Sequence, residues 1–239
     1  MGVYTSGQVL YLLATLPTFP VFLLYLAAAF SYRYWRLKVP VYDLKWVITL
    51  HNVCCVLLSA AAWLCFMWYL MFRADSIYSK TRDTTLQRIF LLYSFSKALE
   101  LCDTLFMMLR RKSAQISSLH VYHHASMLLL SDCGYRVFPW ACMAVPIAIN
   151  SFVHVLVYSY YLATNLQWDV ARFKKPLTQV QLLQFIGGLP YVLWGIRAHQ
   201  FCYYSLVFDV SMIVLFGNFY VRNYWGWFGG GKQQKHKVH

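Results

Sequence analysis

The chain has 239 residues, of which 60% are hydrophobic and 12% are charged. Soluble domains carry about 25% charged residues, so the composition excludes an ordinary soluble protein, and the length fits a single domain. The formal net charge is +13, but the lysines and arginines lie between long apolar blocks. They therefore favour membrane orientation and anionic head groups or substrates, and no nucleic acid partner is expected.

Apolar blocks follow one another along the chain, and most are long enough to cross a bilayer as helices. We predict an all-α integral membrane protein, a single polytopic membrane domain over residues 1–239 with seven transmembrane helices. Pro17 and Pro20 should kink the first span. The predicted spans cover about residues 9–30, 46–71, 86–109, 119–132, 140–162, 179–197 and 202–224, followed by a polar tail at 225–239.

The two sides of this predicted bundle differ in positive charge. Most lysines and arginines fall into the loops after the first, third and fifth spans and into the tail. The positive-inside rule therefore predicts a multi-pass protein with a cytosolic C-terminus. Lys235 and Lys237 resemble a dilysine-type retrieval signal, which predicts the endoplasmic reticulum membrane. A solvated basic tail is the alternative interpretation of these two lysines.

Three histidines stand together inside an apolar environment, in the sequence LHVYHHASM at residues 119–127. His120, His123 and His124 are spaced i, i+3 and i+4, so they share one face of a helix. Polar groups inside a membrane are usually functional. We expect these imidazoles to line a site.

The third predicted span contains four polar residues in the sequence KALELCDT. Glu100, the only glutamate of the chain, lies one turn from Lys97 and one turn from Thr104, and Asp103 lies further around the helix. A structural ion pair is the simpler interpretation, although desolvation makes buried pairs weak stabilisers. Four polar side chains in a chain with so few charges favour a polar-lined cavity.

The fifth predicted span carries a stripe of hydrogen-bonding groups in the sequence NSFVHVLVYSYY. Asn150, His154, Tyr158 and Tyr161 recur at helical spacing and share one face. A lone intramembrane histidine is more often a satisfied core residue. Because this one is flanked by polar residues on its face, we expect it to share a site with the three histidines.

The remaining polar residues of the spans are less informative. Thr178, Gln181 and Gln184 follow at three-residue spacing and either contact substrate or join helices. His51 lies near the start of the second span, where we interpret it as an end residue of the helix rather than a site residue. Asp209 in the seventh span receives no assignment.

Four convergent imidazoles could bind a metal or carry out covalent and acid–base chemistry. Membrane desaturases and hydroxylases use more histidine ligands than the four that converge here, and no metal is expected. Imidazole can also attack a thioester and form an acyl-imidazole. A histidine-box desaturase or hydroxylase and a lipid transporter with a polar path remain the alternatives.

The polar segments carry a family resemblance. From about Tyr93 to Tyr224 the chain resembles the ELO family of fatty acid elongases, whose four signature motifs occur in order on successive spans. One departure is Val157, where the third motif usually has methionine, a conservative apolar change. The matching segments are KALELCDT (97–104), HVYHH (120–124), NSFVHVLVYSYY (150–161) and TQVQLLQ (178–184).

The resemblance implies the condensing step of chain elongation. A long-chain acyl-CoA and malonyl-CoA would become a 3-oxoacyl-CoA two carbons longer, with release of CoA and carbon dioxide. It also implies the family fold, in which six of the seven transmembrane helices form an inverted barrel around a narrow acyl tunnel. Tyr122 and its neighbours are most similar to members that extend polyunsaturated chains. No cofactor is implied beside the two CoA substrates.

The same resemblance suggests roles for the polar residues. His123 would attack the acyl thioester and hold the acyl group. His154, with Asn150, would polarise the malonyl thioester carbonyl and stabilise the enolate. His120 and His124 would orient the nucleophile or transfer protons.

Further residues would support these groups or bind substrate. The charged residues of the third span would contact and orient the catalytic residues, or assist decarboxylation; they are Lys97, Glu100 and Asp103. The other candidates for substrate contact or support are Thr104, Tyr158, Tyr161, Thr178, Gln181 and Gln184. CoA would dock at the cytosolic end on Lys174, Lys175, Arg110 and Arg111.

The expected partners are acyl-CoA, malonyl-CoA and membrane lipid. Only the resemblance implies the other enzymes of the elongation cycle, a ketoacyl reductase, a dehydratase and an enoyl reductase. NADPH would belong to those enzymes, because the chain has no glycine-rich nucleotide-binding motif. A homodimer is left open.

Overall fold

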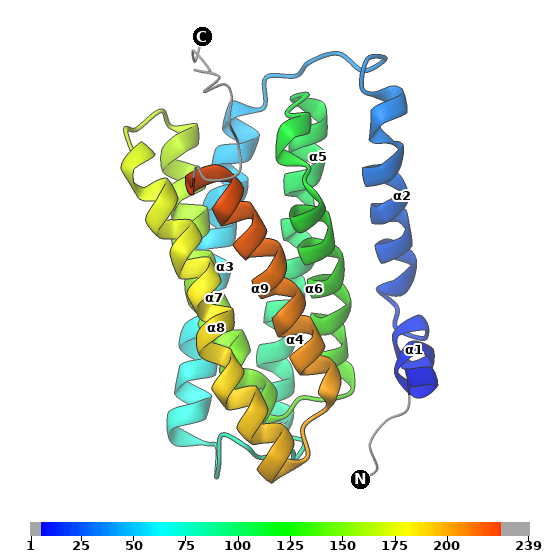
Figure 1. Cartoon of the computed structure of the whole chain (residues 1–239), viewed down its shortest axis with the longest axis vertical. Coiled ribbons are helices and arrows are strands. Elements are labelled where there is room, and N and C mark those ends of the chain that lie inside the picture. Colours follow the sequence, from blue (N-terminus) through cyan, green and yellow to red (C-terminus); the bar gives the residue numbers. More distant parts are fainter. Residues whose placement is uncertain (1–5, 226–239) are drawn as a thin grey trace.

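The computed structural model describes residues 6–225, within which every regular element is a helix (Figure 1). The predicted retrieval signal at Lys235 and Lys237 lies outside the described residues. Helices α3–α9 stand together as a bundle, and α2 packs against α6 at its edge. The elements are α1 (Ser6–Ala14), α2 (Phe19–Trp35), α3 (Lys45–Phe72), α4 (Thr84–Glu100), α5 (Cys102–Leu109), η1 (Ser113–Gln115), α6 (Ser118–Arg136), α7 (Ala141–Asn165), η2 (Ala171–Phe173), α8 (Lys174–His199) and α9 (Tyr203–Tyr224).

The first predicted span is two helices rather than one kinked helix. α1 and α2 are bent by 87° at the break between them. Pro17 lies in that break and Pro20 in the first turn of α2. A proline lacks the amide proton that would continue the preceding helix but is well tolerated in a first turn. The prediction that the prolines disturb this segment is confirmed, and the disturbance is larger than expected.

The third predicted span is also divided, at Leu101 within KALELCDT. The amide of Leu101 donates to the carbonyl of Ala98 at 3.3 Å, and the amide of Thr104 donates to Leu101 at 3.2 Å. These i to i−3 bonds tighten the helix locally, which often marks a functional or strained segment. The tightening separates α4 from α5 in the middle of the polar motif.

The predicted end of the fourth span, at about residue 132, is wrong, because α6 continues to Arg136. The Asp132 carboxylate is buried and accepts hydrogen bonds from Arg136 Nε at 2.7 Å and Thr18 Oγ1 at 2.8 Å. With both carboxylate oxygens bonded, the residue is accommodated inside the bundle. The sixth span is likewise longer than predicted, since α8 begins at Lys174 and ends at His199.

Three helices are long and apolar enough to cross a membrane, namely α3, α7 and α9. The bent pair of α1 and α2 would make a fourth span if it crosses as one unit. The described residues therefore form a multi-pass membrane protein. Helices α4, α6 and α8 carry the polar motifs of the chain, which lowers their apolar character, and the seven-span inverted barrel stays a prediction.

The largest buried core joins α3, α4 and α7. Phe66 packs edge-on against Phe90 at 5.2 Å and against Tyr93 at 6.0 Å between ring centroids. Gly134 lets α6 approach this core, because a Cβ there would lie 2.8 Å from an edge atom of the Phe90 ring. This packing fixes the relative positions of the helices that carry the polar motifs.

Asp83 is the N-cap of α4 and fixes where that helix begins. Its Oδ1 accepts the backbone amides of Thr85 at 2.6 Å and Leu86 at 3.1 Å. Burial opposes ionisation of this carboxyl group, but the amide hydrogen bonds favour the carboxylate, and the net result is a pKa below its usual value. The cap therefore stabilises the fold in its ionised form.

We expect Asp83→Ala to lower stability by about 1 kcal/mol at neutral pH, because two amides of the first turn lose their acceptor. Since the pKa is lower in the folded state, this stabilisation is complete above the unfolded-chain pKa of about 3.9. It is lost as the pH falls through the lower folded-state pKa. Thermal unfolding midpoints in detergent between pH 3 and 7 measure the effect.

The matched control is Asp75→Ala, which removes an exposed aspartate from the loop that precedes the same helix. It should leave the midpoint nearly unchanged across the pH range. Equal shifts for the two variants would contradict a specific capping role for Asp83.

Candidate active site

Histidines from two helices meet inside the bundle. The ring centroids of His123 on α6 and His154 on α7 lie 5.9 Å apart with the rings nearly parallel. His124 lies 5.5 Å from His123 and 4.3 Å from His120. The i, i+3, i+4 spacing on α6 thus gathers three imidazoles on one face, opposite the single histidine of α7.

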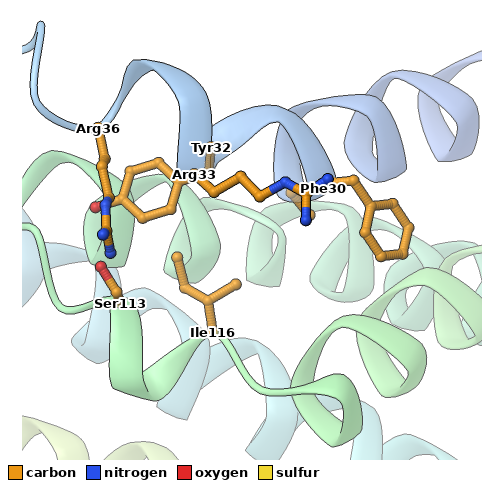
Figure 2. A pocket seen from close by; sticks show the side chains of 7 residues that line it. Phe30, Tyr32, Arg33, Arg36, Ser113 and Ile116 are labelled. Carbon is orange, nitrogen blue, oxygen red and sulfur yellow. The ribbon is translucent and has the colours of Figure 1, made fainter.

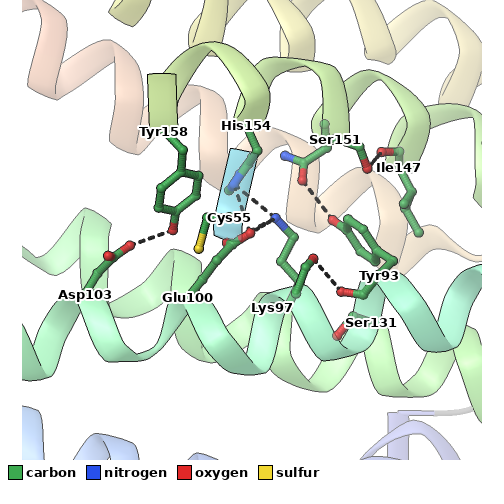
Figure 3. Close-up of polar contacts among 12 residues, drawn as sticks. Cys55, Tyr93, Lys97, Glu100, Asp103, Ser131, Ile147, Ser151, His154 and Tyr158 are labelled. Atoms are coloured by element: carbon green, nitrogen blue, oxygen red, sulfur yellow. Dashed lines mark hydrogen bonds and ion pairs between the residues drawn. The ribbon is translucent and has the colours of Figure 1, made fainter. Parts of the chain in front are cut away.

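A buried ion pair orients His154 (Figure 3). Lys97 Nζ lies 2.8 Å from Glu100 Oε1 and 3.1 Å from Oε2, and the two residues are only 2% and 1% exposed. His154 Nδ1 contacts both partners, at 3.1 Å from Lys97 Nζ and 3.2 Å from Glu100 Oε1. Because Nδ1 is held in this way, Nε2 is the nitrogen left for chemistry, and the contact at Nδ1 sets its protonation.

Asp103 joins three helices. Its Oδ1 lies 2.9 Å from His51 Nε2 on α3, and its Oδ2 accepts the hydroxyl of Tyr158 on α7 at 2.6 Å. Our interpretation of His51 as an end residue of its helix is therefore wrong. The residue is 6% exposed, and its side chain belongs to the polar cluster.

A periodic signal in the sequence could have placed His51 correctly. On α3 it begins the buried face that continues through Cys55, Ser59, Ala62 and Phe66. These residues recur every three or four positions, which is the spacing of one helical face. A residue in register with such a face is more often buried than terminal.

Thr104 connects the cluster to the outer helix α2. Its hydroxyl lies 2.7 Å from His120 Nε2 and 3.0 Å from the hydroxyl of Tyr25. Tyr25 was not predicted from the sequence as a site residue, because it lies in the apolar first part of α2, residues 19–30. His120 is thereby positioned through its Nε2 by a hydrogen-bond chain that reaches α2.

Asn150 lies at the other end of the stripe on α7. Its Oδ1 accepts the hydroxyl of Tyr93 at 2.8 Å, and its Nδ2 donates to Gln184 Oε1 on α8 at 3.4 Å. Tyr93, on α4, is a second polar partner that the sequence analysis did not name. Together these bonds tie α4, α7 and α8 at the level of the site.

Some predicted residues lie outside this network. Thr178 donates its hydroxyl to the Lys174 carbonyl of its own helix, and Gln181 makes no side-chain hydrogen bond within residues 6–225. Tyr161 is 40% exposed and contacts the ring of Tyr158 edge-on at 5.8 Å. The structure thus brings together the polar residues of α4–α7 and leaves most of the α8 motif apart.

His123 differs from the other imidazoles in its bonding. Its Nδ1 is buried and has no hydrogen-bond partner among the described residues. A buried polar atom without a partner costs about 1–3 kcal/mol and calls for an explanation such as a catalytic role. Within residues 6–225 no group of three or more histidine, cysteine or acidic side chains has an arrangement suited to a metal ion. The expectation that no metal is bound stays a prediction.

The basic residues predicted to bind CoA lie at one end of the bundle, where α5 ends and α8 begins (Figure 1). Arg110 follows α5 directly, and Lys174 and Lys175 form the first turn of α8. Arg111 differs from them, because its guanidinium donates to the Val39 carbonyl at 2.5 Å. It holds the loop between α2 and α3 in place.

Comparison with known proteins identifies the same family. The model of the ELO family, described as the GNS1/SUR4 family, matches residues 11–236. The chain is 32% identical to very long chain fatty acid elongase 2 of Rattus norvegicus over 229 residues, 87% of this chain and 80% of that protein. It is 32% identical to very long chain fatty acid elongase 5 of Homo sapiens over 230 residues, 87% and 74% of the two chains. The protein of that name from Xenopus tropicalis is 36% identical over 170 residues, 65% and 55%.

We expect Lys97→Met to lower stability by about 3–5 kcal/mol, because it leaves the Glu100 carboxylate buried without its cation. The double variant Lys97→Met/Glu100→Gln should be less destabilised than the sum of the two single variants, since neither charge is then stranded. Unfolding midpoints of the four proteins in detergent form the double-mutant cycle.

Arg88→Met removes an exposed cation from the same helix and serves as the control. Its effect should stay within about 0.5 kcal/mol. Strict additivity of the Lys97 and Glu100 substitutions would show that the two charges do not stabilise each other.

Proposed function

The chain belongs to the ELO family of fatty acid elongases, and on this premise we propose that it condenses a long-chain acyl-CoA with malonyl-CoA. The products are a 3-oxoacyl-CoA two carbons longer, CoA and carbon dioxide. As an elongase the protein is a condensing enzyme, a 3-oxoacyl-CoA synthase. The observation that carries the proposed chemistry is the meeting of His123, with its unpartnered nitrogen, and His154, oriented by a buried ion pair.

The first half-reaction transfers the acyl group to His123. An unprotonated ring nitrogen attacks the thioester carbonyl carbon, the C–S bond breaks, and the proton of the other ring nitrogen leaves with CoA as its thiol. No hydrogen bond to a described residue occupies Nδ1 of His123, which supports this assignment. His124 lies beside His123, and His120 lies beside His124, so these two imidazoles can transfer the proton.

The second half-reaction uses His154 on malonyl-CoA. When Lys97 donates to Nδ1 of His154, the ring proton resides on Nε2 and can donate to the thioester carbonyl. Loss of carbon dioxide then leaves an enolate whose oxygen this donor stabilises. The enolate carbon forms the new C–C bond as the C–N bond to His123 breaks, and the leaving imidazole takes up one proton that is supplied by solvent, since the overall reaction consumes a proton. Asn150 Nδ2 donates one of its two hydrogens to Gln184, so the other can donate a second hydrogen bond to the enolate oxygen.

The coenzyme would dock at the end of the bundle where α5 ends and α8 begins. Lys174 and Lys175 in the first turn of α8 and Arg110 after α5 offer cations for its phosphates. The positive-inside rule places this end in the cytosol. The acyl chain would lie in a tunnel inside the inverted barrel, with a preference for polyunsaturated chains.

We expect the purified protein to incorporate radiolabelled malonyl-CoA into 3-oxoacyl-CoA when it is given acyl-CoAs. Among a panel of saturated and polyunsaturated substrates of matched length, the polyunsaturated ones should give the larger kcat/KM. Chelators and anaerobic conditions should leave the rate unchanged. A dependence on oxygen and an electron donor would identify a desaturase or hydroxylase. Lipid flux in liposomes without condensation would identify a transporter.

We expect intact-mass measurement after incubation with acyl-CoA alone to show one acyl adduct on the wild-type protein. His123→Ala should lose this adduct, because the nucleophile is gone. His154→Asn should keep the adduct but lower condensation by about 10²–10³, the range found when a donor to a developing oxyanion is removed. This pair of variants separates the two half-reactions.

Tyr122→Phe is the control for the adduct measurement, because it changes the residue next to His123 and leaves every imidazole in place. It should form the adduct normally. An unchanged adduct in His123→Ala would show that His123 is not the nucleophile that carries the acyl group. Product formation by a wild-type protein that never carries an adduct would favour direct condensation.

A further inference from the structure

A pocket of about 310 Å³ lies outside the histidine cluster, between the last turns of α2 and the segment that connects α5 to α6 (Figure 2). Its walls include Phe30, Tyr32 and Ile116, and its polar groups come from Arg33, Arg36 and Ser113. α2 is the outer helix of the molecule (Figure 1), so the pocket lies at the periphery of the bundle.

The two arginines of this pocket have no acidic partner among the described residues. The Arg36 backbone amide donates to the Tyr32 carbonyl, but its side chain makes no hydrogen bond or ion pair within residues 6–225 and points toward Ser113 in Figure 2. Arg33 donates to the hydroxyl of Tyr34 and lies 4.6 Å from the centre of that ring, with no carboxylate in contact. Guanidinium groups recognise phosphate through several parallel hydrogen bonds. Arg36 beside the Ser113 hydroxyl therefore forms an anion-binding arrangement, and Arg33 adds a second cation at the other end of the pocket, where Phe30 lies (Figure 2).

The apolar part of the pocket continues onto a face that meets lipid. Phe30 is 68% exposed, and Leu23 and Leu24 are exposed on the same helix. In a membrane protein such a face contacts acyl chains, which places phosphate groups of the lipid at the level of nearby basic residues. The Tyr32 hydroxyl is bonded to the Met108 carbonyl at 3.0 Å, so this wall of the pocket is fixed.

We propose that this pocket binds an anionic membrane phospholipid, with its phosphate at Arg36 and Ser113, Arg33 attracting the head group from the other end of the pocket, and an acyl chain along the exposed face of α2. The same phosphate chemistry could come from a coenzyme. Two features favour the lipid: the peripheral position of α2 and the apolar surface that leads away from the cations. The basic residues assigned to CoA at the start of α8 lie on the far side of the bundle from α2 (Figure 1).

The test is native mass spectrometry of the detergent-solubilised full chain with dioleoyl phosphatidate, and with dioleoyl phosphatidylcholine for comparison. The wild-type protein should retain phosphatidate in preference to phosphatidylcholine. Arg33→Gln/Arg36→Gln should weaken phosphatidate binding by about tenfold or more, since each basic group near a membrane contributes about 1 kcal/mol.

Lys38→Gln/Lys45→Gln is the matched control, because it removes two positive charges that follow the same helix, one in the loop and one at the start of α3, but none from the pocket. It should bind phosphatidate as the wild-type protein does. Equal losses in the two double variants would show general attraction to positive charge and overturn the proposal.

A second experiment uses the soluble nucleotide adenosine 3′,5′-bisphosphate, which carries the phosphates of a coenzyme without an acyl chain. If the proposal is right, this nucleotide does not displace phosphatidate, and its own binding to the protein is the same in the wild type and in Arg33→Gln/Arg36→Gln. Displacement of the lipid, together with weaker nucleotide binding in that variant, would assign the pocket to the coenzyme instead. Unfolding midpoints of all variants establish that the binding differences arise in folded protein.

Discussion

A buried ion pair between Lys97 and Glu100 is the interaction on which the rest of the site depends. Moving two charges out of water costs several kcal/mol each, and only close contact and further hydrogen bonds compensate for it. His154 supplies the additional contact through its Nδ1. α7 must therefore pack with this residue against the pair, which brings its imidazole to the histidines of α6. The burial of the ion pair and the meeting of the histidines therefore follow from one constraint.

Asp103, one turn after Glu100, is a second buried carboxylate that needs bonding partners from neighbouring helices. Its two oxygens are bonded to His51 of α3 and Tyr158 of α7, so a single carboxylate fixes α5 against both helices. The helix tightens at Leu101, between Glu100 and Asp103, and both carboxylates find partners on α7. Polar groups in an apolar bundle thus determine the register of the helices, since apolar contacts alone are tolerant of sliding.

The sequence predicted the presence of the helices, and which polar residues would meet between them, better than it predicted where the helices begin and end. Periodicity was sufficient for His120, His123, His124 and His154, because each lies on a continuous face that repeats at helical spacing. His51 was misjudged because its position near the start of a span was given more weight than its register with the buried face of α3. Its partner, Asp103, is 52 residues away, so the hydrogen bond itself could not be predicted locally. Helix ends depend on similarly distant bonds, such as that from Thr18 to Asp132, so the end of the fourth span could not be placed from its local sequence.

The outer helix α2 shows how a peripheral element obtains a fixed position without a large apolar core. Three polar contacts hold it: Thr18 to Asp132, Tyr25 to Thr104, and Tyr32 to the carbonyl of Met108. The three residues on α2 are spaced by seven, so they fall on one face two helical turns apart. Lipid competes with apolar side chains for the surface of a membrane helix, and association then relies on packing and hydrogen bonds. The hydroxyl groups of Thr18, Tyr25 and Tyr32 form such hydrogen bonds with α5 and α6. The middle one of the three, Tyr25, also connects α2 to His120 through Thr104.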